Sequence, residues 1–159
     1  MPLGMKFITS LFILLIVFSK TSFATLTIQE VKYFASLRSN ETNVRSGPGH
    51  HYPIKFTFQN KNIPVLVVSE YDNWLEIQDY ENEKGWVSQS LITKKRHLMV
   101  INPTQNVAMY KKNNINSKIL FFLENFVIGE YKKCQEIMCL ISINNKEGWV
   151  KKENLYGFD

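Results

Sequence analysis

Hydrophobic and polar residues alternate along several short stretches, which is the pattern of β-strands that bury one face. Ile54, Phe56 and Phe58 alternate with polar residues. Leu75 and Ile77 share one face of a second stretch. Each stretch is too short for a stable helix and is bounded by turn-forming residues. The pattern therefore predicts an all-β fold.

The densest set of strand and turn signals lies between residues 43 and 87. Val44 is expected to point inward just before Gly47-Pro48-Gly49 turns the chain. Residues 65–68 form a continuous apolar run, which predicts a more fully buried strand. Gly85-Trp86-Val87 follows a polar hairpin turn and predicts the returning strand. These elements together predict a small, closed β-sheet module.

In this order and spacing, the motifs resemble the bacterial SH3-like domain (SH3b), in the form found in exported proteins. The resemblance covers residues 35–92 and rests on Asn-Val-Arg-Ser-Gly-Pro-Gly at 43–49, Tyr-Pro-Ile at 52–54, Trp74 with Ile77, and Gly-Trp-Val at 85–87. It implies a small, five-stranded, half-open β-barrel without catalytic residues. It also implies a role in recognising cell-wall or other peptides.

The second half of the chain repeats the order of these signals. Asn106-Val107 follows Asn43-Val44 by 63 residues, and Gly148-Trp149-Val150 follows Gly85-Trp86-Val87 by the same 63. A tandem duplication is the economical interpretation of a shared period. We therefore predict two tandem small SH3-like barrels.

The second copy is degenerate at the positions that a ligand would use. Ala108 replaces Arg45, and the position of Trp74 falls on either Cys134 or Met138. No Gly-Pro-Gly follows in this copy. We expect the first module to carry the ligand site and the second to be mainly structural.

The predicted organisation places the boundary between the modules in a charged segment. It comprises a signal peptide at residues 1–24, a lead-in at 25–34, a first SH3-like domain at 35–92, a linker at 93–99 and a degenerate second SH3-like domain at 100–159. Alternatively, Val100 and Ile101 complete a strand shared by both modules. A barrel of about 60 residues has a marginal core, so pairing of the two modules would help both.

The amino terminus has the pattern of a secretory signal peptide. Lys6 precedes an apolar run at residues 7–18, which is too short to cross ~30 Å of hydrocarbon comfortably. Ser22 and Ala24 offer the small side chains that signal peptidase needs. A buried core helix and an uncleaved anchor are the alternatives. We expect cleavage after Ala24, a periplasmic or secreted protein, and no membrane span after cleavage.

The charge of the chain does not predict nucleic-acid binding. Removing Lys6 and Lys20 from the 19 basic residues leaves 17 against 14 acidic residues, a net charge of +3. The longest basic cluster is Lys94-Lys95-Arg96, whereas a nucleic-acid footprint needs a stripe of positive charge. The composition, 45% hydrophobic and 21% charged, is that of an ordinary globular protein.

Cys134 and Cys139 are the two cysteines of the chain. Their even number, their hairpin spacing and an oxidising compartment favour a disulfide. A redox-active pair would need two intervening residues at a helix amino terminus, whereas four lie between these cysteines in a strand pattern.

No catalytic or metal-binding pattern is visible in the sequence. His50 and His51 are adjacent on an extended segment, where neighbouring side chains point apart, so they are poorly placed for one metal ion. His97 lies in the charged linker, and no acid or base signature surrounds it. We expect no enzyme, no metal and no cofactor. An accessory role beside a cell-wall hydrolase stays open.

We predict a non-catalytic exported module that binds cell-wall peptide or a periplasmic protein segment. The expected ligand-binding residues are Arg45, Tyr52, Trp74 and Trp86. Alternation directs Trp74 outward, and only one of Trp86 and Val87 is expected to face the core. Arg45 offers a guanidinium to a ligand carboxylate. The alternative function is a structural scaffold of the cell envelope without a small ligand.

The predicted signal peptide can be tested on protein recovered from a secreting host. Its first residue is expected to be Thr25, because Ser22 and Ala24 suit the peptidase. Mass spectrometry of the amino-terminal peptide measures this directly. Secreted protein that retains Met1 would contradict the prediction.

Overall fold

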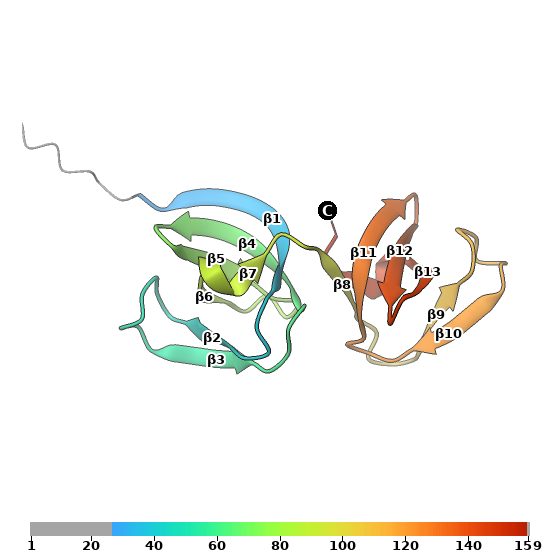
Figure 1. Ribbon diagram of the computed structural model, residues 1–159, viewed down its shortest axis with the longest axis horizontal. Coiled ribbons are helices and arrows are strands. Elements are labelled where there is room, and N and C mark those ends of the chain that lie inside the picture. The colour runs from blue at the N-terminus through green and yellow to red at the C-terminus, as the bar shows by residue number, and fades with distance from the viewer. Residues whose placement is uncertain (1–26, 159) are drawn as a thin grey trace, which may run out of the picture.

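The computed structural model describes residues 27–158 and shows an all-β chain with two seven-stranded antiparallel sheets side by side (Figure 1). Within these residues there is no α-helix. Nor does any helix in this range have the length and apolar character to cross a membrane. The predicted signal peptide at residues 1–24 lies outside the described part of the chain.

The first sheet begins at Gln29, earlier in the chain than residue 35, where the resemblance to SH3b begins. Its strands are β1 (Gln29–Leu37), β2 (Thr42–Arg45), β3 (Ile54–Phe58), β4 (Pro64–Tyr71), β5 (Trp74–Gln78), β6 (Lys84–Ser88) and β7 (Ile92–Thr93), and the 3-10 turn η1 (Gln89–Leu91) precedes β7. Their order is β3-β2-β6-β5-β4-β1-β7. Strand β1 thus extends into the segment expected as a lead-in, and it pairs with β4.

The second sheet starts within the segment expected as a linker. Its strands are β8 (His97–Val100), β9 (Val107–Tyr110), β10 (Ile119–Leu123), β11 (Ile128–Gln135), β12 (Met138–Ile143), β13 (Lys146–Lys151) and β14 (Leu155–Tyr156), and η2 (Lys152–Asn154) precedes β14. Their order is β10-β9-β13-β12-β11-β8-β14. Numbered from its own first strand, this order is identical to that of the first sheet.

Neither sheet is a closed barrel, which corrects the expectation of a closed module, and each has seven strands rather than the five that the resemblance implies. In the described residues, β3 and β7 are the edges of the first sheet, and β10 and β14 are the edges of the second. Closure would require the two edges of each sheet to pair. Strand β7 contains only two residues and is already paired with β1, so it offers little edge for closure.

Strand pairing aligns β9 with β2 in a register that differs by two residues from the sequence match. Arg45 pairs with Trp86, and Tyr110 pairs with Trp149. Because the two tryptophans correspond, Tyr110 occupies the position of Arg45. The expected replacement by Ala108 is therefore wrong.

Pairing also decides which residue of the second sheet corresponds to Trp74. Trp74 pairs with Ser88, which directly precedes η1. Met138 pairs with Lys151, which directly precedes η2. Of the two sequence alternatives, Met138 rather than Cys134 thus occupies the Trp74 position.

Each sheet encloses its own apolar core. The first consists of Ala35, Leu37, Val44, Val65, Val67, Leu75, Ile77, Val87 and Ile92. The second consists of Leu98, Val100, Val107, Met109, Leu123, Cys139, Ile141, Val150 and Leu155. Full burial of one aliphatic side chain stabilises a fold by about 1.5–3 kcal/mol. The predicted inward direction of Val44, Leu75 and Ile77 is confirmed.

Burial along β4 differs from the expectation of a continuously buried run. Val65 and Val67 are fully buried, whereas Leu66 and Val68 are half-buried. The strand therefore has one core face and one partly covered face. An unbroken apolar run does not by itself reveal this difference.

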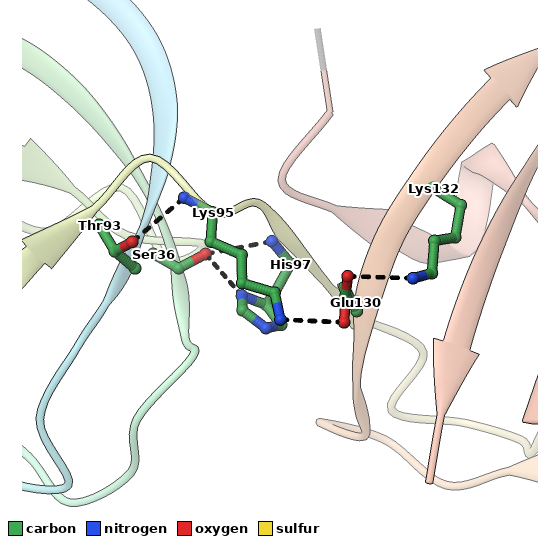
Figure 2. A network of polar contacts seen from close by, with 6 residues as sticks. All are labelled: Ser36, Thr93, Lys95, His97, Glu130 and Lys132. Carbon is green, nitrogen blue, oxygen red and sulfur yellow. Dashed lines mark hydrogen bonds and ion pairs between the residues drawn. The ribbon is translucent and has the colours of Figure 1, made fainter. Parts of the chain in front are cut away.

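His97 connects the two sheets through Ser36 of β1 (Figure 2). Its backbone N–H donates to Ser36 Oγ at 3.1 Å, and its Nδ1 lies 3.1 Å from the same oxygen. Both residues are buried. Burial lowers the pKa of His97, and the charge of Lys95 lowers it further, whereas Glu130 opposes the shift. Lys95 forms a 3.0 Å ion pair with Glu130.

The end of the second sheet also packs back onto the first. The hydroxyl of Tyr156 donates to the carbonyl oxygen of Gln78 at 3.0 Å, and its ring centroid lies 5.3 Å from that of Phe34. Burial, followed by the charge of Asp79, raises the pKa of Tyr156 to about 12. This contact and the His97 contact hold the two sheets against each other.

Cys134 and Cys139 lie opposite each other on the β11–β12 hairpin, as the sequence predicted. They are at disulfide distance, with 4.0 Å between their Cα atoms. The bridge closes only a short loop, so it constrains little of the unfolded chain.

Reduction of this bridge is expected to lower the free energy of unfolding by ~2 kcal/mol at most, because the closed loop is short. Urea unfolding with and without dithiothreitol measures the change. A variant with Cys134→Ala and Cys139→Ala is the control and should not respond to the reductant. Two free thiols in the native exported protein would contradict the bridge.

The buried His97 is expected to make the protein less stable at mildly acid pH. Its pKa in the folded state lies below the ordinary value of about 6.5, so the unfolded chain binds the proton more readily. Stability from the neutral ring is thus complete above this value and falls as the pH decreases. Urea unfolding at about pH 7.5 and about pH 5.5 should show a smaller pH effect for His97→Gln than for the wild type. Equal pH effects in both proteins would contradict this prediction.

Candidate functional site

The loop between β2 and β3 lies at the end of the first sheet that faces away from the second sheet (Figure 1). Its base is closed by the Ser46 N–H, which donates to the Pro53 carbonyl at 3.0 Å. The ring of Tyr52 packs on the loop backbone, since a Cβ atom at Gly47 would lie 2.6 Å from that ring. The Gly-Pro-Gly turn therefore lets the tyrosine ring lie directly on the chain.

Trp74 lies beside this loop, at the first position of β5. It is half-buried, while the next residue, Leu75, is 2% exposed. This confirms the outward direction predicted from alternation. The His50 ring lies 5.0 Å from the Trp74 ring at an interplanar angle of 74°, an edge-to-face contact. From the sequence, His50 was considered only as a possible metal ligand, and this contact was missed. The contact depends on the path of the loop, which the sequence alone does not give.

Arg45 contacts the same loop from the end of β2. Its Nη1 donates to the Tyr52 carbonyl oxygen at 2.8 Å. A guanidinium carries five N–H donors, so most of its hydrogen-bonding capacity is left for another group. The surface around this loop, here called the loop face, consists of Arg45, His50, His51, Tyr52 and Trp74. Within it, the His51 and Tyr52 ring centroids lie 4.2 Å apart.

Trp86 contributes little to the loop face because it is almost covered. Of the two residues Trp86 and Val87, only Val87 belongs to the apolar core, as alternation predicted, although Trp86 is itself only 8% exposed. Trp86 pairs with Arg45 of β2 and with Glu76 of β5, so its side chain lies on the face opposite Val87, between those of its two partners. A ligand on the surface therefore finds little of the Trp86 ring.

The corresponding region of the second sheet has different side chains, with Tyr110 at the Arg45 position. Met138, at the Trp74 position, is 1% exposed. The β9–β10 loop is closed by the Lys111 N–H, which donates to the Lys118 carbonyl at 2.9 Å. Ile115 from this loop and Ile137 from the β11–β12 turn are both exposed and line a hollow of about 360 Å³. This region therefore has neither a guanidinium at the Arg45 position nor a tryptophan at the Trp74 position.

The loop face has the chemistry of a binding surface. Its aromatic rings can stack on a ligand, and its guanidinium can pair with a carboxylate. Within residues 27–158 there is no group of three or more His, Cys, Asp or Glu residues that could hold a metal ion.

Comparison with known proteins gives one family match and one curated relative. Residues 38–94 match the family model of the bacterial SH3 domain. Over 85 residues the chain is 36% identical to YrvJ of Bacillus subtilis (strain 168), whose name provisionally assigns it as an N-acetylmuramoyl-L-alanine amidase. The match covers 52% of this chain and 16% of YrvJ. The chain thus spans less than a fifth of that relative.

Solved structures show only loose similarity to this chain. NlpC2 and NlpC1 of Trichomonas vaginalis have TM-scores of 0.36 and 0.37 at 9% and 8% identity. The alignments cover 80% and 79% of this chain, and 48% and 46% of those chains. An NlpC/P60 family protein of Bacillus cereus ATCC 10987 has a TM-score of 0.34 at 12% identity, covering 79% of this chain and 57% of its own. Scores this low give no weight to any statement about function.

The family match contains the whole loop face and most of the first sheet. It agrees with the resemblance carried by the Asn-Val-Arg-Ser-Gly-Pro-Gly and Gly-Trp-Val motifs. The family match thus supports a bacterial SH3 domain at residues 38–94 of this chain.

Proposed function

We propose that this protein is an exported, non-catalytic module that binds cell-wall peptide through the loop face. The bacterial SH3 match and the relative named for N-acetylmuramoyl-L-alanine amidase activity support an association with the cell wall. The paired cysteines fit the oxidising compartment that export would provide. Because the chain covers 16% of that relative, the proposal transfers none of its catalytic activity.

The observation that carries the proposal is the exposure of Trp74 beside ordered loop residues. Packing of the Tyr52 ring on the loop, and of His50 on Trp74, reduces the ordering that a ligand would have to impose. An extended peptide can stack on these rings while its carboxylate pairs with Arg45. A periplasmic protein segment with the same chemistry is the other ligand compatible with this surface.

We further propose that the two sheets are tandem SH3-like units and that the second is mainly structural. Their identical strand order supports common architecture. Burial of Met138 at the Trp74 position supports a different use of the second unit.

A scaffold role in the cell envelope is the second candidate function. It is favoured by the contacts that join the units, namely His97 with Ser36 and Tyr156 with Gln78. Such contacts suit a rigid spacer that needs no small ligand. Failure of the wild-type protein to be retained on purified cell wall would favour this role over the binding function.

Trp74→Ala is expected to weaken retention on purified cell wall by about 1–3 kcal/mol in binding free energy, because a contact residue is lost. The melting temperature should be nearly unchanged, since Trp74 lies outside the buried core. A pull-down series and a thermal melt measure the two quantities.

Two matched variants control this experiment. Phe122→Ala removes a 63% exposed ring from the second sheet and should leave retention unchanged. Met138→Ala alters the buried residue at the corresponding position and should lower stability without weakening binding per folded molecule. The binding function would be refuted if Trp74→Ala lost about 3 kcal/mol or more of stability and was retained in proportion to its folded fraction.

A further inference from the structure

A groove of about 550 Å³ lies between the two sheets, on the side of the first sheet away from the loop face. Phe56 and Phe58 of β3, with Tyr80 of the β5–β6 turn, contribute the wall from the first sheet. Phe126 and Ile128 contribute the wall from the second. Its volume and apolar walls are within the range of small ligand sites. Since both sheets supply walls, neither sheet forms this groove alone.

All charged groups that line the groove in the described residues are carboxylates, namely Asp79, Glu81 and Glu83. This is unusual for a chain with a net charge of +5. Asp79 is 6% exposed, and its Oδ1 accepts the backbone N–H groups of Glu81 and Glu83, both at 2.9 Å. Among residues 27–158, no hydrogen bond to its Oδ2 is described. The groove thus offers negative charge beside apolar side chains.

Phe126 is held in a backbone conformation that does not suit a bulky residue. Its φ is 66°, and its N–H donates to the Val100 carbonyl at 2.8 Å. In the first sheet the corresponding residue is Asn62, with φ of 67° and an equivalent bond to the Leu37 carbonyl at 2.8 Å. Asparagine tolerates this left-handed region, whereas phenylalanine is strained there. The turn alone therefore does not account for phenylalanine.

The Phe126 side chain instead belongs to the groove. It is 50% exposed, and its ring centroid lies 5.4 Å from that of Tyr80 on the opposite wall. Because the Phe126 ring is exposed and lies outside the core of the second sheet, burial in that core does not offset its backbone strain. Strained residues of this kind concentrate at binding sites.

We propose that the groove between the sheets binds a peptide segment in which an apolar side chain adjoins a lysine-type cation. The apolar side chain would lie between Phe126 and Phe58, and the cation would lie against Glu81 and Glu83. The contacts of His97 and Tyr156 hold the walls in place before binding. This site is separate from the loop face and does not depend on it.

The test is a titration of the secreted protein with N-acetylated, C-amidated Lys-Phe-Lys, followed by amide NMR shifts. Shifts at the groove and a dissociation constant on the order of 1 mM or tighter are expected. Glu-Phe-Glu, the matched acidic peptide, should bind about tenfold more weakly or not at all. Glu81→Gln combined with Glu83→Gln should weaken Lys-Phe-Lys to a similar extent, because both side chains are exposed and carry the charge.

Phe126→Asn separates binding from structure, because asparagine suits the backbone conformation while lacking the ring. It should keep or raise the melting temperature and weaken Lys-Phe-Lys about tenfold or more. Phe122→Asn, at an exposed ring outside the groove, should bind like the wild type. If Phe126 only joins the sheets, Phe126→Asn will melt earlier and bind in proportion to its folded fraction, which overturns the proposal. Equal binding of the two peptides, or none by the wild type, also overturns it.

Discussion

The fold depends on the close approach of β2 to β6. A Cβ atom at Gly85 would collide with the Val44 side chain and lie 2.9 Å from the Arg45 carbonyl oxygen. In the second sheet, a Cβ atom at Gly148 would lie 2.6 Å from Met109 Cε. Only glycine allows the two strands to lie this close, so each sheet coils over its own core. The same approach fixes the end of β2 and thereby the base of the loop that carries the candidate site.

Sequence periodicity correctly gave the direction of side chains in β5 and β6, but not how far neighbouring side chains cover the outer face. In β5 the alternation correctly separated Trp74 from Leu75 and Ile77, because only one side of this strand meets the core. In β6 alternation also separated Val87, which lies in the core, from Trp86. Trp86 is nevertheless buried on the outer face, where it pairs with Arg45 and Glu76 of the flanking strands. The burial of Trp86 thus depends on residues of the flanking strands rather than on its local sequence.

Features that depend on distant pairing or on the second unit were also beyond the sequence. Asn43-Val44 and Asn106-Val107 are identical in sequence but do not correspond in the structure. Val44 contacts Gly85, whereas Met109 contacts the equivalent Gly148. The contact of His97 with Ser36 depends on how the two sheets are oriented, which no local pattern encodes. Strand β1, by contrast, could have been predicted from its alternation of residues. Every second residue contacts or belongs to the first core, namely Val31, Tyr33, Ala35 and Leu37.

Outside their cores, the two sheets can carry residues of quite different chemistry at corresponding positions. Core packing keeps these buried positions apolar, and Ile77 and Ile141 are the same residue at corresponding positions. At strand ends the constraint is weaker, and there Asn62 corresponds to the strained Phe126. A ring at that turn gains contacts only because the first sheet supplies Tyr80 opposite it. The second sheet therefore departs from the first at a position whose use depends on having a neighbour, which is the behaviour expected if the pair, rather than either sheet, is the functional unit.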